Sequence, residues 1–131
     1  MTVLGIDYGR VRIGLALADG PLAEPLITLS AENRQKLIEK IATIVTENKV
    51  EKIIIGLSEG KMAQETLQFA SSLEQSLGIK VISVDETLTT HEAQEKLTEA
   101  HRKSKQKRKL IDTASAAIIL QSWLDHFPVA V

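Results

Sequence analysis

The chain has 131 residues, of which 44% are hydrophobic and 25% are charged, so we expect one globular domain over residues 1–131. The absence of cysteine excludes a disulfide framework, a structural zinc site and thiol catalysis. No apolar stretch is long enough to span a bilayer and no secretion signal is visible, so we expect a cytoplasmic protein without a membrane partner.

The first third of the chain predicts three antiparallel strands. Val3–Asp7 and Ile13–Ala18 are apolar runs joined by a short segment with Gly9, which is typical of a β-hairpin. Pro25–Leu29 follows a second turn and begins at a proline, as edge strands can.

The middle of the chain alternates helices with strands. Ser30 is the predicted N-cap of an amphipathic helix over residues 31–48. Strands expected to be buried follow at Lys52–Leu57 and Lys80–Asp85. Between them, a second helix over residues 62–77 is indicated by apolar side chains at helical spacing: Met62, Leu67, Ala70, Leu73 and Leu77.

Two more helices are predicted near the C-terminus. A capping box from Thr89 to Glu92 opens the first of them. The last runs from about Leu110 to Leu124, and its centre is apolar nearly all round, so we expect it to be buried against a sheet. Two right-handed crossovers would place the later strands parallel to Val3–Asp7 and make that strand central. Ligands of open α/β sheets bind at the carboxyl ends of such strands.

Carboxylates stand at the ends of three separate apolar elements. Asp7 ends the first strand, Asp85 and Glu86 end the last strand, and Asp112 opens the last helix. Hard cations take oxygen ligands, so these four acids are candidate ligands for Mg²⁺ or Mn²⁺ in two-metal phosphodiester hydrolysis. Strand alternation places only one of Asp85 and Glu86 on the site face, and the pattern does not choose between them. Taken singly, each acid also fits a turn or helix-capping role.

The net charge of −1 hides a strongly basic segment at residues 102–109. Because this segment leads directly to Asp112, we expect it to bind the phosphate backbone of a nucleic acid, with an affinity that falls steeply with salt. A solvated loop between two helices is the alternative. Its six cations are Arg102, Lys103, Lys105, Lys107, Arg108 and Lys109.

Several motifs together resemble the YqgF family of pre-16S ribosomal RNA nucleases, which is related to the Holliday-junction resolvases of ribonuclease-H-like fold. The matching segments, spread over essentially the whole chain, are Gly5-Ile6-Asp7-Tyr8-Gly9, Arg12-Ile13-Gly14-Leu15-Ala16, Ile54-Ile55-Gly56-Leu57, Asp85-Glu86-Thr87-Leu88-Thr89-Thr90, Ile111-Asp112 and Ala116-Ala117-Ile118-Ile119-Leu120-Gln121.

The resemblance implies an α/β domain of ribonuclease-H-like architecture, with a mixed five-stranded sheet flanked by helices. It implies a divalent-metal nuclease, a hydrolase, in which Asp7, Glu86 and Asp112 are catalytic. Arg10 and Arg12 of the first hairpin are further candidates for phosphate contacts. The implied role is 5′-end processing of pre-16S rRNA in ribosome biogenesis, with cleavage of branched DNA at Holliday junctions as the alternative.

Two other classes of function fit parts of the sequence. The opening motif also occurs in the ATP-binding phosphotransferase fold, but that fold needs two such lobes and 131 residues supply one. A non-catalytic RNA-binding module for ribosome assembly would keep the basic segment and need no metal. The sequence shows no clear dimer stripe, so both a monomer and a homodimer stay open.

Overall fold

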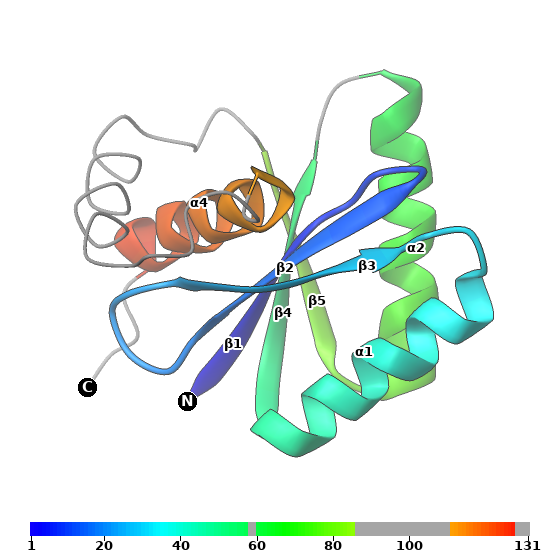
Figure 1. The fold of residues 1–131 in the computed structure, drawn as a ribbon. Helices are drawn as coiled ribbons and strands as arrows, with labels where there is room; N and C mark the ends of the chain where they lie inside the picture. The colour runs from blue at the N-terminus through cyan, green and yellow to red at the C-terminus, as the bar shows by residue number, and fades with distance from the viewer. Residues whose placement is uncertain (58–59, 86–110, 128–131) are drawn as a thin grey trace.

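The computed structural model describes residues 1–57, 60–85 and 111–127. None of the helices within these ranges is both long and apolar enough to cross a bilayer. The helix predicted from Thr89, the acid Glu86 and the basic segment 102–109 lie outside the described residues. The elements, labelled as in Figure 1, are β1 (Thr2–Asp7), β2 (Arg12–Ala18), β3 (Glu24–Ser30), α1 (Arg34–Asn48), β4 (Val50–Leu57), α2 (Lys61–Leu77), β5 (Lys80–Asp85) and α4 (Ile111–His126).

The five strands form one mixed sheet in the order β3-β2-β1-β4-β5 (Figure 1). β2 pairs antiparallel with both β1 and β3, whereas β4 pairs parallel with both β1 and β5. This confirms the predicted five-stranded mixed sheet with β1 at its centre. Because β1, β4 and β5 are parallel, their carboxyl ends meet at one edge of the sheet.

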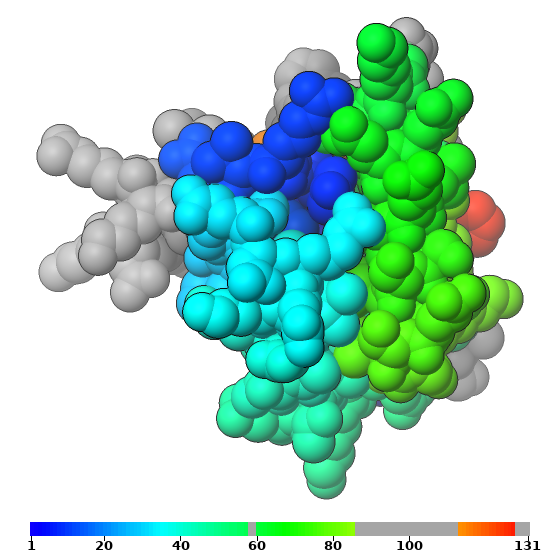
Figure 2. All heavy atoms as spheres, turned by 90° about the vertical axis from the view of Figure 1, so that its right-hand side faces the viewer, coloured from blue at the N-terminus to red at the C-terminus, as the bar shows by residue number. Residues whose placement is uncertain are grey.

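Helices cover both faces of the sheet. On the first, the α1/α2 face, Leu4 and Ile6 pack against apolar residues of α1 and α2. On the second, the α4 face, Val3 packs in a core with Ala16 and with residues of α4. Figure 2 views the first face from outside, with α1 in cyan and α2 in green lying side by side. Successive strand residues alternate between the two cores, as pleated strands require.

The start of α1 differs from the prediction. Ser30 belongs to β3, where it pairs with Arg12, and is therefore not the helix cap. The helix begins at Arg34, and the side chain of Asn33 caps it by accepting a hydrogen bond from the Lys36 N–H at 3.0 Å. Asn and Ser are about equally good N-caps, so strand pairing decided between the two positions.

In two elements the observed burial differs from what the apolar pattern of the sequence indicates. In α2, Leu67 is 47% exposed, whereas Phe69 is fully buried and lies 4.8 Å from the Tyr8 ring, centroid to centroid. Phe69 shares the inward side of α2 with Ala70 and Leu73, which the predicted helical pattern included. β5 was expected to be a buried strand, but it is the last strand in the sheet order, and Ser83 and Asp85 are exposed.

Candidate metal centre at the carboxyl end of β1

Asp7 is the last residue of the central strand and is half-buried. Ile6 points into the core of the α1/α2 face, and Val3 points into the core of the α4 face. By alternation Asp7 therefore lies on the α4 face. Its neighbour across the β1–β2 pair is Gly14. The structure thus places the first predicted ligand at the sheet edge where α/β proteins bind their ligands.

The direction of α4 is set by contacts of its C-terminal half. Gln121 is fully buried; its side-chain oxygen accepts a hydrogen bond from the Ala23 N–H at 2.9 Å, and its amide donates to the Pro21 carbonyl at 2.9 Å. The Lys52 ammonium, near the start of β4, lies 5.8 Å from the centroid of the Trp123 ring. These partners lie at the amino end of β1, so the helix start points toward its carboxyl end.

Two glycines let α4 lie very close to the sheet. A Cβ added to Gly5 would lie 2.7 Å from the Leu120 Cβ and 3.0 Å from the Ala116 carbonyl oxygen. A Cβ added to Gly56 would lie 2.6 Å from Cδ1 of Ile119. Both distances are shorter than ordinary carbon contacts of about 3.5–4.0 Å, so larger residues would force the helix or its side chains to move.

This seating brings the start of α4 to the level of Asp7. Ala116 of α4 packs against Gly5 of β1. Asp7 follows Gly5 by two residues on the same face of the sheet, and Asp112 precedes Ala116 by about one helical turn. Because the start of α4 points toward the carboxyl end of β1, the Asp112 backbone lies on the Asp7 side of the contact between Ala116 and Gly5. The Asp112 side chain is not among those described. Within the described residues, no three acidic or histidine side chains form a cluster that could hold a metal.

Asp85 lies on the opposite face of the sheet from Asp7. Val84 is buried in the core of the α4 face, whereas Val81 packs against the other core. Asp85 is exposed and pairs with Leu57 at the ends of β5 and β4. Alternation therefore assigns Asp85 to the α1/α2 face, which argues against it as a partner of Asp7.

Arg10 forms an ion pair with α2. Its Nε and Nη2 donate to the two carboxylate oxygens of Glu65, each at 2.9 Å. This hydrogen bonding raises the pKa of Arg10 and lowers the pKa of Glu65. The pair is exposed, so it adds little stability and a phosphate could compete for the guanidinium. Arg12, the first residue of β2, is also exposed.

A buried polar residue that no sequence motif indicates follows Asp112 directly. Thr113 is only 1% exposed, and its hydroxyl finds no hydrogen-bond partner among the described residues. A threonine next to an acid at a helix start usually indicates capping, so the sequence gives no signal that this hydroxyl is buried.

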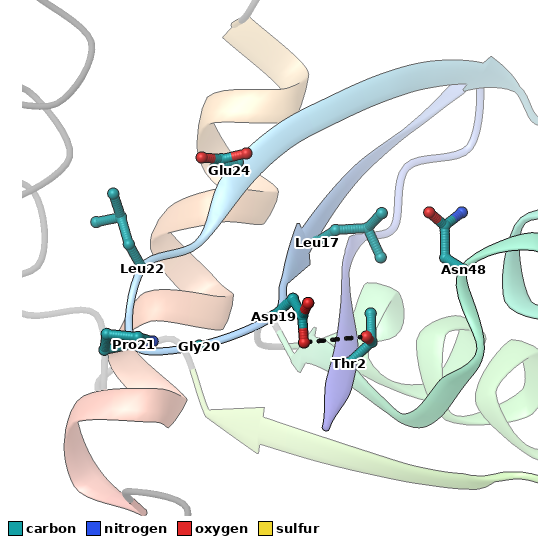
Figure 3. A pocket seen from close by; sticks show the side chains of 8 residues that line it. All are labelled: Thr2, Leu17, Asp19, Gly20, Pro21, Leu22, Glu24 and Asn48. Atoms are coloured by element: carbon teal, nitrogen blue, oxygen red, sulfur yellow. Dashed lines mark hydrogen bonds between the residues drawn. The ribbon is translucent and has the colours of Figure 1, made fainter.

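The described part of the chain also has a pocket of about 420 Å³, but at the other end of the sheet (Figure 3). Thr2, which opens the strand that Asp7 ends, lines it and donates a hydrogen bond to Asp19 at 3.4 Å. The pocket therefore lies away from the candidate ligands. Its lining residues are Thr2, Leu17, Asp19, Gly20, Pro21, Leu22, Glu24 and Asn48.

The sheet order and the helices on its two faces define an α/β domain of ribonuclease-H-like fold. The solved structure of Thermus thermophilus RuvC in complex with a Holliday junction substrate superposes with a TM-score of 0.66, at 15% identity over 99% of this chain and 98% of that one. The fowlpox virus resolvase in complex with Holliday junction DNA gives 0.63, at 14% identity over 98% and 99%. At these identities, the likeness establishes the fold.

The chain belongs to the RuvX family, whose model is described as Holliday junction resolvase and matches residues 1–126. Two relatives carry the name "Putative pre-16S rRNA nuclease". The one from Syntrophus aciditrophicus is 41% identical over 133 residues, which cover 95% of this chain and 89% of the relative. The one from Mycobacterium ulcerans is 42% identical over 132 residues, which cover 94% and 78%. The chain is thus a hydrolase of a nuclease family, and the resemblance drawn from its motifs is confirmed.

Proposed function

We propose that this chain is a divalent-metal-dependent nuclease that trims the 5′ end of precursor 16S rRNA in the cytoplasm. The observation that carries this proposal is the position of Asp7, at the carboxyl end of the central strand and on the face that α4 covers. The names of its relatives support the choice of substrate.

The proposed ligands are Asp7, Glu86 and Asp112. Asp7 and the backbone of Asp112 lie on the same face of the sheet, and carboxylate oxygens suit Mg²⁺ or Mn²⁺. Asp85 faces the other way, so Glu86 is the acid of that pair that we assign to the centre. Bound cations of this kind neutralise charge on the attacking and leaving oxygens of a phosphodiester and lower the pKa of a water.

Two tasks fall to the chain itself: placing the side chains that bind the metal, and binding the phosphate backbone of the nucleic acid. Gly5 and Gly56 let α4 lie close to the sheet, and we infer that this closeness determines how far Asp112 lies from Asp7. We assign the basic segment 102–109 to the phosphate backbone, which positions a nucleic acid without reading its sequence. Arg10 and Arg12, at the β1–β2 turn, would also bind phosphates of the nucleic acid. Arg10 would then leave its ion pair with Glu65 and pair with a phosphate instead.

The test compares the wild type with Asp7→Asn in Mn²⁺-dependent cleavage of an RNA that carries the 5′ precursor extension of 16S rRNA. Asp19→Asn is a matched control, because Asp19 is an exposed aspartate at the opposite end of the sheet. We expect wild type and Asp19→Asn to cleave, Asp7→Asn to be inactive, and all three to show the same circular dichroism. Full metal-dependent activity of Asp7→Asn would remove Asp7 from the centre.

A second candidate activity is cleavage of branched DNA. The description of the matching family model favours it, so a four-way DNA junction is the second substrate in the same assay. Preferential cleavage of the junction would replace the rRNA assignment and keep the metal centre. Binding of RNA without cleavage of either substrate would favour a non-catalytic module for ribosome assembly.

A further inference from the structure

Two hydroxyl groups on α4 are buried without a hydrogen-bond partner among the described residues. They belong to Thr113 and Ser122, and each of these residues is only 1% exposed. A buried hydroxyl that forms no hydrogen bond lowers the stability of a protein, so its presence requires an explanation.

Two threonines in the other helices donate their hydroxyls to a carbonyl of their own helix. Thr66 donates to the Met62 carbonyl at 2.6 Å, and Thr43 donates to the Glu39 carbonyl at 3.1 Å. Thr113 is the third residue of α4, so the residue four positions before it precedes the helix. The carbonyl that a helical threonine usually bonds, four residues earlier, is therefore not part of α4. A valine at position 113 would fill the same space without burying a polar atom.

The two hydroxyls lie at opposite ends of the helix. Thr113 directly follows Asp112, at the end of α4 that points toward the carboxyl end of β1. It is one turn before Ala117, which is buried in the core between α4 and the sheet. Ser122 is adjacent to Gln121 and Trp123, whose contacts lie at the amino end of β1. Only Thr113 is therefore buried beside the proposed metal centre.

We propose that Thr113 is a positioning residue of this metal centre, whose hydroxyl oxygen accepts a hydrogen bond from a water that the cation holds beside Asp7 and Asp112. The inference rests on the proposed function. Mg²⁺ usually keeps several of its waters when it binds a protein, and such waters donate hydrogen bonds to neighbouring oxygen acceptors, such as a threonine hydroxyl. Hydrogen bonds of this kind orient the ligands and strengthen metal binding.

The experiment measures Mn²⁺ affinity by calorimetry on the full chain, for the wild type and for Thr113→Val, Thr113→Ser and Ser122→Ala. Thermal unfolding with and without Mn²⁺ is followed in parallel by the fluorescence of Trp123, the single tryptophan. Thr113→Ala takes the place of the valine variant if that variant does not fold. Asp7→Asn reports whether the wild-type signal comes from the proposed centre.

We expect Thr113→Val to bind Mn²⁺ about 10-fold more weakly, as is typical when a hydrogen bond to the ligand shell is lost. Without metal it should be at least as stable as the wild type, because it no longer buries an unpaired hydroxyl. Thr113→Ser should restore the affinity. Ser122→Ala, the matched control, should bind Mn²⁺ as the wild type does.

Wild-type affinity in Thr113→Val, together with loss of binding in Asp7→Asn, would overturn the role of Thr113 and leave the proposed function intact. An equal loss in Ser122→Ala would also overturn it, because the effect would then come from packing of the helix. A wild-type chain that does not bind Mn²⁺ would overturn both the metal centre and this inference.

Discussion

Replacing Gly5 by alanine tests whether the close seating of α4 sets the geometry of the proposed centre. The added Cβ would lie 2.7 Å from the Leu120 Cβ and 3.0 Å from the Ala116 carbonyl oxygen. Neither atom is the end of a flexible side chain, so the helix must move to reach ordinary contact distance, by roughly 1 Å. Overpacking of this size costs about 1–3 kcal/mol in the free energy of unfolding.

The same movement would carry Asp112 away from Asp7. A misplacement of about 1 Å in a catalytic site can cost on the order of 100-fold in rate. We therefore expect Gly5→Ala to fold with a Tm lower by roughly 5 °C, and to lose about 100-fold in Mn²⁺-dependent cleavage. Thermal unfolding followed by circular dichroism and cleavage at saturating Mn²⁺ measure the two effects.

Gly56→Ala is the matched comparison. Its Cβ would meet Cδ1 of Ile119 at 2.6 Å, which is the end of a side chain and can rotate away. Gly56→Ala should therefore lose less stability and less cleavage activity than Gly5→Ala. Adding Ile119→Val, which removes that methyl group, to Gly56→Ala should restore most of both. If Gly5→Ala cleaved at the wild-type rate, or Gly56→Ala were the more damaged variant, the seating of α4 on Gly5 would not control the centre.

Three further changes test the remaining assignments. Glu86→Gln should lower the cleavage rate by more than the roughly 10–100-fold that is typical of changes next to, but not among, the direct metal ligands. Asp85→Asn should lower the rate by less than Glu86→Gln. Equal, mild losses in the two variants would mean that neither acid binds a metal. Changing the three cations of residues 107–109 to glutamine should weaken nucleic-acid binding and flatten its salt dependence by roughly one unit of slope per lost contact, at unchanged Mn²⁺ affinity; an unaltered slope would identify a solvated linker. The lowered pKa of Glu65 keeps its ion pair with Arg10 formed at neutral pH, and the pair breaks only in acid. Glu65→Gln should therefore free Arg10 to bind a phosphate, and should steepen the salt dependence of nucleic-acid binding, measured by fluorescence anisotropy, by about one unit of slope. If this variant bound nucleic acid no more tightly than the wild type, Arg10 would not belong to the interface.

The sheet could be predicted because each strand is a distinct apolar run and the chain order permits few topologies. The N-cap of α1 could not be predicted, because serine and asparagine are about equally good caps. Only the pairing of Ser30 in β3 leaves Asn33 as the cap. In α2 the pattern included the buried Ala70 and Leu73 but left out Phe69, whose contact with Tyr8 is a tertiary effect.

The candidate site was predictable to a similar degree. An acid at the end of a central apolar strand is visible in the sequence, so the position of Asp7 could be predicted, and its role as a metal ligand stays a prediction. The pattern could not choose between Asp85 and Glu86, because Val81 and Val84 are both apolar. In the structure Val84 is buried in one core and Val81 packs against the other, and by alternation this assigns Asp85 to the α1/α2 face. Thr113 gave no signal, because the burial of a hydroxyl depends on how α4 lies on the sheet.

The position of the metal is the most direct test of the central claim. Crystals of the wild type grown with Mn²⁺ should show an anomalous difference peak at about 2 Å from a carboxylate oxygen of Asp7, between the end of β1 and the start of α4. The peak should disappear in crystals of Asp7→Asn. A peak away from Asp7, or one that persists in Asp7→Asn, would contradict the account.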